Sequence, residues 1–503
     1  MSVNPYDVIV IGAGHNGLVA ANYLAKTGKK VLVLERRAIP GGQVVTESFS
    51  DGFAVDTLHP GGRLRPDIVR DLDLARHGLP AESTDRPVYW SLLENGRRLR
   101  LLADGNDSAT LASLGEFSAH DATRWPEFVS FMDKAAAFLD AAYRTPMPRL
   151  PPTLSTSVPL AKLAWKLRRL GGKDMFKVIR AMSMSTLELT EEWFESAEVR
   201  AAIAAVGIHG STIGSMSAGG GYTLMHNWLN RGGLAHRQVA GGTGRIADAL
   251  VAALKSKGGE LRMSAGVARI LVDKQQVTGV QLDGGEEIAA RSVFSAADPR
   301  HTLLFLVGAV ELPPEFVWHT QSIKMRGSVA KVHLLTDGSH DLPAGTLAIA
   351  PSLKYLERAF DAAKYGAISE QPYLEVTSRG DIVSIHFQFA PYTLRQGDWD
   401  SARARIEALA VETLAPHFPA LKASICETRS ITPPDMEKTY GLTEGDLNHG
   451  QLILDQMFFM RPLPGWSDHR TPIDGLTLCG SGVHGGGGIS GASGRNAAQQ
   501  SNR

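Results

Sequence analysis

The stretch Asp7-Val-Ile-Val-Ile-Gly-Ala-Gly-His-Asn-Gly17 decides the fold of this 503-residue chain. Its apolar run over residues 8–11 predicts a short strand that is buried on both faces. Gly12, Gly14 and Gly17 follow at once in G-x-G-x-x-G spacing, which is typical of a turn into a helix at a dinucleotide site. We expect the first glycine to permit the tight turn, the second to admit a pyrophosphate, and the third to let helix and strand pack closely.

A second predicted strand, over residues 31–34, ends on Glu35, eighteen residues after Gly17. An acid at this place accepts hydrogen bonds from a ribose diol and repels a 2′-phosphate. The free N–H groups and the positive dipole end of the intervening helix can hold phosphates without a lysine. A glycine turn in another α/β protein is the alternative, but strand, helix, second strand and acid all agree with a dinucleotide site.

The overall composition bounds the class of protein. A chain of 503 residues predicts two or three domains, which can be built from interleaved segments. Hydrophobic residues make up 43% and charged residues 21%, as in ordinary globular enzymes. Lys+Arg and Asp+Glu number 52 each, so we expect no nucleic acid partner. The sequence predicts no oligomeric state.

Only two cysteines occur, Cys426 and Cys479, and they form no C-x-x-C pair. We therefore expect no disulfide framework, no dithiol redox couple and no metal site, and a reducing compartment. The first predicted strand begins after six residues and no apolar run approaches 18 residues, so we expect neither a signal peptide nor a membrane-spanning helix. The prediction is a cytoplasmic protein.

A second glycine-rich stretch, over residues 239–244, could be another dinucleotide loop with Glu260 as its acid. The protein would then be a pyridine-nucleotide reductase with separate FAD and NAD sites. We weigh against this reading, because the polar residues 236–238 stand where a buried apolar strand is required.

Two stretches indicate FAD and not NAD as the cofactor. They are Glu35-Arg-Arg-Ala-Ile-Pro-Gly-Gly42 and the glycine-rich residues 475–498. They resemble the flavoproteins of the amine oxidase and phytoene desaturase superfamily. The chain looks closest to the phytoene dehydrogenase-related proteins, in the subgroup called pyridine nucleotide-disulphide oxidoreductase domain-containing protein 2. The family usually has arginine after the paired glycines, where this chain has Gln43.

The resemblance implies an α/β fold with a Rossmann-like FAD-binding domain of the glutathione-reductase-2 type. An interleaved substrate domain would consist of a mixed sheet and a helical cap. Residues 1–80, 236–310 and 440–503 would form the FAD-binding domain. Residues 81–235 and 311–439 would form the substrate domain, with the cap at about 118–210.

The resemblance also implies which residues contact FAD, and it places a helix start near Ile489 where N–H groups can hold the negative charge of a reduced flavin. Besides the three glycines of the fingerprint, the implied contacts are Glu35, Arg37, Gly42, Val267, Gly480, Ser481, Gly487, Gly488 and Ile489.

Three histidines lie in segments that the resemblance places near the flavin: His59, His449 and His484. With an unperturbed pKa of about 6.5, an imidazole suits proton removal beside a hydride transfer. For each of them the alternative is a structural histidine held by backbone groups.

Two further patterns leave alternatives open. The stripe Leu160, Leu163, Leu167 and Leu170 is flanked by basic residues and Trp165, so residues 160–170 could lie on a membrane surface or cover a core. In the predicted strand over residues 382–389, Ser384, His386 and Gln388 alternate with apolar residues and could line a substrate cavity or face solvent.

The leading prediction is an FAD-dependent oxidoreductase that removes hydride from a C–C or C–N bond of a largely apolar small molecule. One alternative is a redox-neutral isomerase or hydratase that uses reduced FAD. Another alternative, from a different class, is a flavin-binding interaction protein with little turnover.

Overall fold

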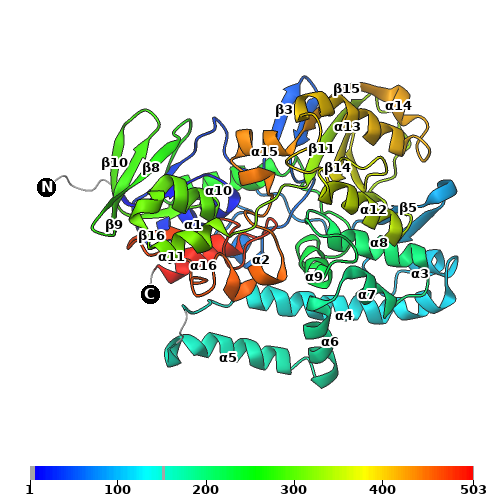
Figure 1. Cartoon of the computed structure of the whole chain (residues 1–503), viewed down its shortest axis with the longest axis horizontal. Helices are drawn as coiled ribbons and strands as arrows, with labels where there is room; N and C mark the ends of the chain where they lie inside the picture. The colour runs from blue at the N-terminus through cyan, green and yellow to red at the C-terminus, as the bar shows by residue number, and fades with distance from the viewer. Residues whose placement is uncertain (1–5, 150–152, 502–503) are drawn as a thin grey trace.

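The computed structural model describes residues 6–149 and 153–501, which form two main sheets at opposite ends of the molecule (Figure 1). The chain passes between the two sheets several times. The first sheet is built from strands near the start, in the middle and near the end of the described residues.

The first sheet has the strand order β7-β2-β1-β10-β9-β8, and β16 also pairs with the end of β10, at residues 293–295. The neighbours β7, β2, β1, β10 and β16 run parallel, whereas β10, β9 and β8 form an antiparallel meander. The strands are β1 (Tyr6–Ile11), β2 (Val31–Leu34), β7 (Glu260–Arg262), β8 (Val267–Asp273), β9 (Gln276–Leu282), β10 (Glu287–Ser295) and β16 (Leu476–Leu478).

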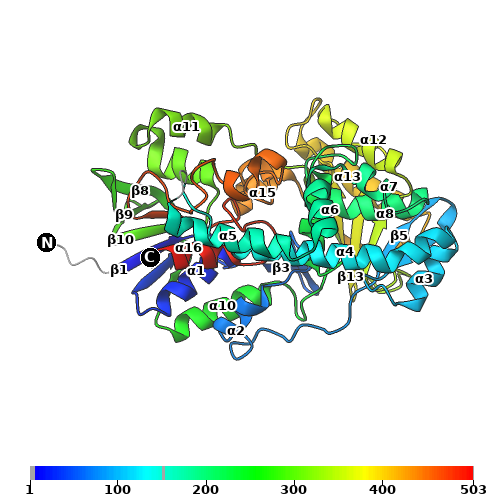
Figure 2. The same ribbon diagram turned by 90° about the horizontal axis from the view of Figure 1, so that it is seen from below.

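Side chains from both faces of β1 are buried. Val8 and Val10 pack in one hydrophobic cluster with helices α1, α10 and α16, and Ile9 and Ile11 pack in another on the opposite face. Figure 2 shows α1 and α10 on one side of these strands and α11 on the other. The predicted strand, buried on both faces, is confirmed. The helices are α1 (His15–Ala25), α2 (Pro66–Asp71), α10 (Gly244–Ser256), α11 (Pro314–Gln321) and α16 (Ala492–Gln500).

The second sheet has the order β15-β11-β14-β13-β12-β5-β6 and is antiparallel except for the pair β12 and β5. Its strands are β5 (Tyr89–Leu92), β6 (Arg98–Leu101), β11 (Val329–Thr336), β12 (Thr346–Ile349), β13 (Leu374–Arg379), β14 (Ile382–Gln388) and β15 (Ile425–Ile431). The helices α12 (Leu353–Lys364), α13 (Trp399–Leu414) and α14 (Leu421–Ser424) accompany it, and α15 (Pro433–Tyr440) follows β15. A separate hairpin pairs β3 (Thr46–Ser50) with β4 (Phe53–Asp56).

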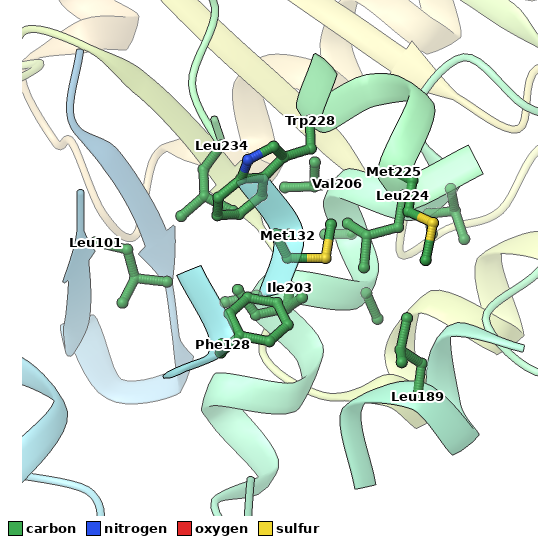
Figure 3. Close-up of a cluster of buried hydrophobic side chains, with 14 of the residues drawn as sticks. Leu101, Phe128, Met132, Leu189, Ile203, Val206, Leu224, Met225, Trp228 and Leu234 are labelled. Atoms are coloured by element: carbon green, nitrogen blue, oxygen red, sulfur yellow. The ribbon is translucent and has the colours of Figure 1, made fainter. Parts of the chain in front are cut away.

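A helical region covers the second sheet. It consists of α3 (Ser108–Gly115), α4 (Ala119–Arg144), α5 (Leu154–Arg168), α6 (Gly172–Ser183), α7 (Thr186–Glu191), α8 (Ala197–Ile208) and α9 (Gly220–Arg231). Its core is visible in Figure 3, where Phe128 and Met132 of α4 lie against Ile203 of α8 and Trp228 of α9. These side chains are at most 1% exposed, so α8 and α9 are held rigidly over the sheet.

The hydrophobic packing does not change at residue 310, where we predicted a domain boundary. Phe316, Ile323 and Met325 share a hydrophobic cluster with Ile9 of the first sheet. This packing groups residues up to about 325 with the first sheet. The last helix begins at Ala492, three residues after the predicted start at Ile489, because Gly491 adopts a left-handed conformation before it.

Within the described ranges, no helix combines the length and the apolar character that crossing a bilayer requires.

Candidate functional site

A cavity of about 510 Å³, here called cavity A, opens where β1 turns into α1. Its walls come from segments that are far apart in the sequence, including the glycine-rich turn, the end of β2, the start of β8 and the loop after β16. The predicted site residues that line it are Gly12, Gly14, Gly17, Glu35, Arg37, Gly42, Val267, His449, Gly480 and Ser481.

The three glycines have different surroundings. Gly12 has a φ of 91°, and a Cβ added to Gly17 would lie only 2.2 Å from the carbonyl oxygen of Gly12. A Cβ added to Gly14 would meet no atom within 4 Å, and Gly14 lines cavity A. The turn and the close packing of helix and strand therefore need the first and third glycines, whereas the second leaves space open toward a ligand.

Glu35 is held at the edge of the cavity by two backbone donors. The Ala13 N–H donates to one carboxylate oxygen (2.8 Å) and the Arg37 N–H to the other (2.9 Å). The side chain is 6% exposed, and each carboxylate oxygen can accept a further hydrogen bond beside the one from the backbone. This arrangement suits a carboxylate that accepts hydrogen bonds from a ribose diol.

Four polar atoms around cavity A are buried without a hydrogen-bond partner: His15 Nε2, Asn16 Oδ1, Arg37 Nη1 and His449 Nδ1. Buried polar atoms are normally paired, so this set fits a ligand that is rich in hydrogen-bonding groups. Burial, helped by the nearby His449, lowers the pKa of His15 to about 4. The other guanidinium nitrogen of Arg37 forms an ion pair with Glu47. A dinucleotide therefore fits both the polar groups and the free space.

The remaining predicted residues lie elsewhere. His59, Gly488 and Ile489 line a second cavity, here called cavity B, of about 90 Å³. Gly487 lines neither cavity, and a Cβ on it would lie 2.8 Å from the ring of His226. His484 also lines neither cavity. Its Nε2 lies 3.2 and 3.1 Å from the carbonyl oxygens of Ala142 and Thr145, so this histidine takes the structural alternative.

Cavity B is lined mainly by polar side chains from the helical region and the second sheet. Five imidazoles and three basic side chains surround it: His59, His209, His226, His236, His386, Arg231, Arg237 and Lys331. Burial holds the pKa of His59 well below its ordinary value, and Lys331 lowers it further. His209 and His226 have pKa values of about 3, mainly through burial, so the imidazoles are neutral at pH 7.

The two cavities share one wall. The imidazole Nε2 of His59, in cavity B, donates to the side-chain oxygen of Gln43, in cavity A (3.0 Å). Gln43 in turn donates to the carbonyl oxygen of Leu447 (2.9 Å). Leu447 lines cavity B, whereas His449 lines cavity A. A ligand in cavity B is therefore separated from cavity A by a single layer of residues.

Sequence reasoning missed most of cavity B. Arg231, Lys331 and His209 lie far apart in the sequence, and nothing in their spacing indicates a site. One signal was present, since the polar side of residues 382–389 could line a cavity. His386 does so and is 3% exposed, and Gln388 is fully buried. In cavity A the missed residues include His15 and Asn16, which occupy the variable positions of the fingerprint.

The second glycine-rich stretch forms no dinucleotide site. The segment over residues 236–239 has no regular secondary structure, so no strand leads into the loop. The backbone N–H of Thr243 donates to the carboxylate of Asp56 (2.8 Å) just before α10, where a phosphate would otherwise bind. The reading that we weighed against is therefore excluded by this geometry.

Comparison with known proteins agrees with the fold. Residues 17–384 match the family model described as flavin containing amine oxidoreductase. The chain is 34% identical to pyridine nucleotide-disulfide oxidoreductase domain-containing protein 2 of Rattus norvegicus, over 98% of this chain and 92% of that protein. It is 24% identical to a lycopene-forming phytoene desaturase of Paracoccus sp., over 97% and 95% of the two chains.

Among solved structures, a double mutant of putrescine oxidase superimposes with a TM-score of 0.57 at 18% identity, covering 99% of both chains. This likeness concerns the fold alone. The match to the family model, which covers most of the chain, and the identity to the rat protein show the family. The chain therefore belongs to the flavin containing amine oxidoreductase family, within the phytoene desaturase superfamily, and is an FAD-dependent oxidoreductase.

Proposed function

We propose that the protein dehydrogenates a C–C or C–N bond of a small molecule held in cavity B by taking hydride from one of its C–H bonds, with FAD held in cavity A. The observation that supports this proposal is the shared wall, where Gln43 and His59 join the two cavities through one hydrogen bond of 3.0 Å. Hydride transfer needs donor and acceptor atoms in direct contact, and Gly488 and Ile489, which the resemblance implies as flavin contacts, line cavity B itself.

Bound FAD supplies the hydride acceptor. The fingerprint glycines and the start of α1 would hold its phosphates, and Glu35 would hold a ribose. His59 has Nε2 engaged by Gln43, which leaves Nδ1 as its acceptor toward cavity B. Because its imidazole is neutral, His59 is our proposal for the group that takes a proton from the substrate.

The side chains around cavity B are mainly polar, so a substrate there needs polar groups as well as apolar surface. The large apolar side chains of the lining are Leu447, Leu452 and Ile489, against many more imidazole, amide and basic groups. Unpaired polar groups around an apolar ligand cost about 1–3 kcal/mol each. We therefore propose that the part of the substrate near the flavin carries groups that form hydrogen bonds.

Anaerobic mixing of the FAD-loaded protein with candidate substrates tests the function. Loss of the oxidised flavin absorbance is the expected result, and His59→Gln should slow it while FAD stays bound. The matched control is His417→Gln, since His417 lies outside both cavities. Turnover only after prior reduction of the flavin, without net electron transfer, would favour the isomerase or hydratase. If no substrate gives either result, the flavin-binding interaction protein is favoured.

We also propose that the protein touches a membrane surface through α5 and α6. None of the α5 side chains from Ser157 to Arg168 is buried, and Trp165 and Phe176 are 59% and 68% exposed. Residues 153–183 carry seven basic residues and one acidic residue in a chain with no net charge. In Figure 1, α5 lies along the lower edge of the molecule, outside α4. A cationic helix with exposed aromatic residues suits anionic lipid.

Sedimentation with vesicles tests this contact. The protein should bind vesicles of phosphatidylcholine with phosphatidylserine more strongly than phosphatidylcholine alone, and the double variant Lys162→Glu/Lys166→Glu should weaken the binding. The double variant Lys354→Glu/Lys422→Glu changes the net charge equally at exposed positions elsewhere and should not. Equal loss in both variants would leave only a general charge effect and refute the proposed surface.

A further inference from the structure

Three ionisable side chains form a row across the second sheet. Lys331 of β11 lies opposite His386 of β14, and His386 lies opposite Glu375 of β13. Residues in register on adjacent strands point to the same face, so the row faces one side of the sheet. Each of the three is at most 3% exposed. Buried ionisable groups are costly, which makes the row a candidate for function.

The carboxylate of Glu375 is already fully engaged. Arg231 approaches it at 3.1 and 3.2 Å, His236 donates to it at 2.5 Å, and the Tyr373 hydroxyl donates at 3.0 Å. Burial opposes ionisation of Glu375, but Arg231 with His209 and His236 outweighs it and holds the pKa well below its ordinary value. Glu375 also does not line cavity B.

A metal ion at this cluster is disfavoured. His209 and His236 could supply nitrogen ligands beside Glu375, since their ligand atoms lie within 4.8 Å of one another. However, the guanidinium of Arg231 already contacts the same carboxylate oxygen at 3.1 Å. A divalent cation would have to displace this positive charge or sit against it.

Lys331 has no such partner. Its ammonium donates to Nδ1 of His386 (2.9 Å), which is a neutral acceptor, and no carboxylate lies within 4.0 Å of it among the residues that the structure places. Burial lowers its pKa to about 7, with Glu375 opposing and Arg231 reinforcing the effect. The side chain lines cavity B, so an anion that enters the cavity would meet an ammonium group without a counter-ion.

We infer that cavity B is an anion site, in which Lys331 pairs with a carboxylate group of the substrate. This inference rests on the proposed function and adds the substrate class, an organic acid in place of a cationic amine. No Asp or Glu lines cavity B in the described part of the chain, so a substrate ammonium would find no counter-ion there. Arg231 and Arg237 also line the cavity, but both are paired with carboxylates, Arg231 with Glu375 (3.1 Å) and Arg237 with Glu82 (3.4 Å).

Pairs of small ions with matched size and opposite charge test the inference on the FAD-loaded protein. Acetate and benzoate should shift the absorbance of the bound flavin, whereas methylammonium and benzylammonium should not. Lys331→Gln keeps an N–H toward His386 but loses the charge. It should weaken acetate and benzoate binding about tenfold or more, the usual size of a charge-assisted hydrogen bond. Lys331→Arg keeps the charge and should retain most of the binding. Lys422→Gln, at an exposed lysine, is the control.

Carboxylate affinity should also depend on pH. Above about pH 7 it should fall about tenfold per pH unit, because deprotonated Lys331 no longer attracts an anion. The groups that face Lys331 should not titrate in this range. His59, His209, His236 and His386 are held neutral by burial, and the buried Glu375 stays ionised against Arg231.

Several outcomes would overturn the inference. Binding of the ammonium ions in place of the carboxylates would do so, and so would carboxylate binding that is unchanged in Lys331→Gln. If this variant shifts the reduction potential of the bound flavin but not carboxylate affinity, Lys331 serves the cofactor and the inference fails. The proposed function fails differently, through absence of flavin reduction by any substrate. If Lys331→Gln does not fold, carboxylate binding by Lys331→Arg and the pH dependence of binding by the unchanged protein still test the inference.

Discussion

Replacement of Gly14 by alanine should separate FAD binding from folding. Gly14 has a φ of −66° and a ψ of 162°, which alanine adopts without strain, and an added Cβ meets no atom within 4 Å. The apoprotein should therefore unfold with the same free energy as the parent, or with up to about 1 kcal/mol more, because alanine restricts the unfolded chain. The methyl group would nevertheless project into cavity A, where we place the pyrophosphate.

The expected loss is in cofactor affinity. Overpacking costs about 1–3 kcal/mol, which corresponds to FAD binding weakened about five- to 150-fold. Quenching of FAD fluorescence on titration into the apoprotein measures this affinity, and urea unfolding of the apoprotein measures the stability.

Gly17→Ala is the matched control for this experiment. Its Cβ would lie 2.2 Å from the carbonyl oxygen of Gly12 and 3.0 Å from the Cβ of Ala296. This variant should therefore destabilise the apoprotein itself by about 1–3 kcal/mol or more. If Gly14→Ala binds FAD as tightly as the parent, or loses as much stability as Gly17→Ala, our placement of the cofactor is refuted.

Further predictions concern stability and pH. Glu35→Gln turns an amide N–H toward a backbone donor of Ala13 or Arg37, so the free energy of unfolding in urea should fall by about 1–3 kcal/mol. Phe128→Ala should cost about 3–5 kcal/mol by the same measurement, and a comparable effect of the half-buried Phe138→Ala would contradict the packing in Figure 3. His226 has a pKa of about 3 because it is buried, so its stabilising contribution is present above pH 6.5 and lost as the pH falls toward 3. Unfolding measured against pH should show this acid loss, and His226→Asn should reduce it.

Part of cavity A could be predicted because the residues that form this part are close together in the sequence. The strand, turn, helix and acid all occur within residues 7–35, and each carries its own steric or electrostatic requirement. The distant walls at Val267 and Ser481 followed from the resemblance to known flavoproteins. The placement of these residues around one cavity agrees with that expectation, and their contact with FAD stays a prediction.

Cavity B could not be predicted, because its side chains come from elements that no local pattern connects. Lys331 lies on β11, His386 on β14 and Arg231 on α9, and only the folded sheet brings them together. His484 is the converse case. Its glycine-rich loop suggested proximity to the flavin, whereas the end of α4 covers the imidazole and accepts its hydrogen bond.

The three-segment construction of the first sheet has a consequence for biosynthesis. Strand β1 leaves the ribosome early, but its neighbour β10 follows only at residues 287–295 and β16 at residues 476–478. Asn16 can donate its hydrogen bond to Ser481 only after residue 481 has been made. The nascent chain therefore carries an unpaired β1 edge until β10 has been made, which exposes it to aggregation. Because Gly480 and Ser481 complete cavity A, bound FAD can stabilise the folded chain only after these residues have been made.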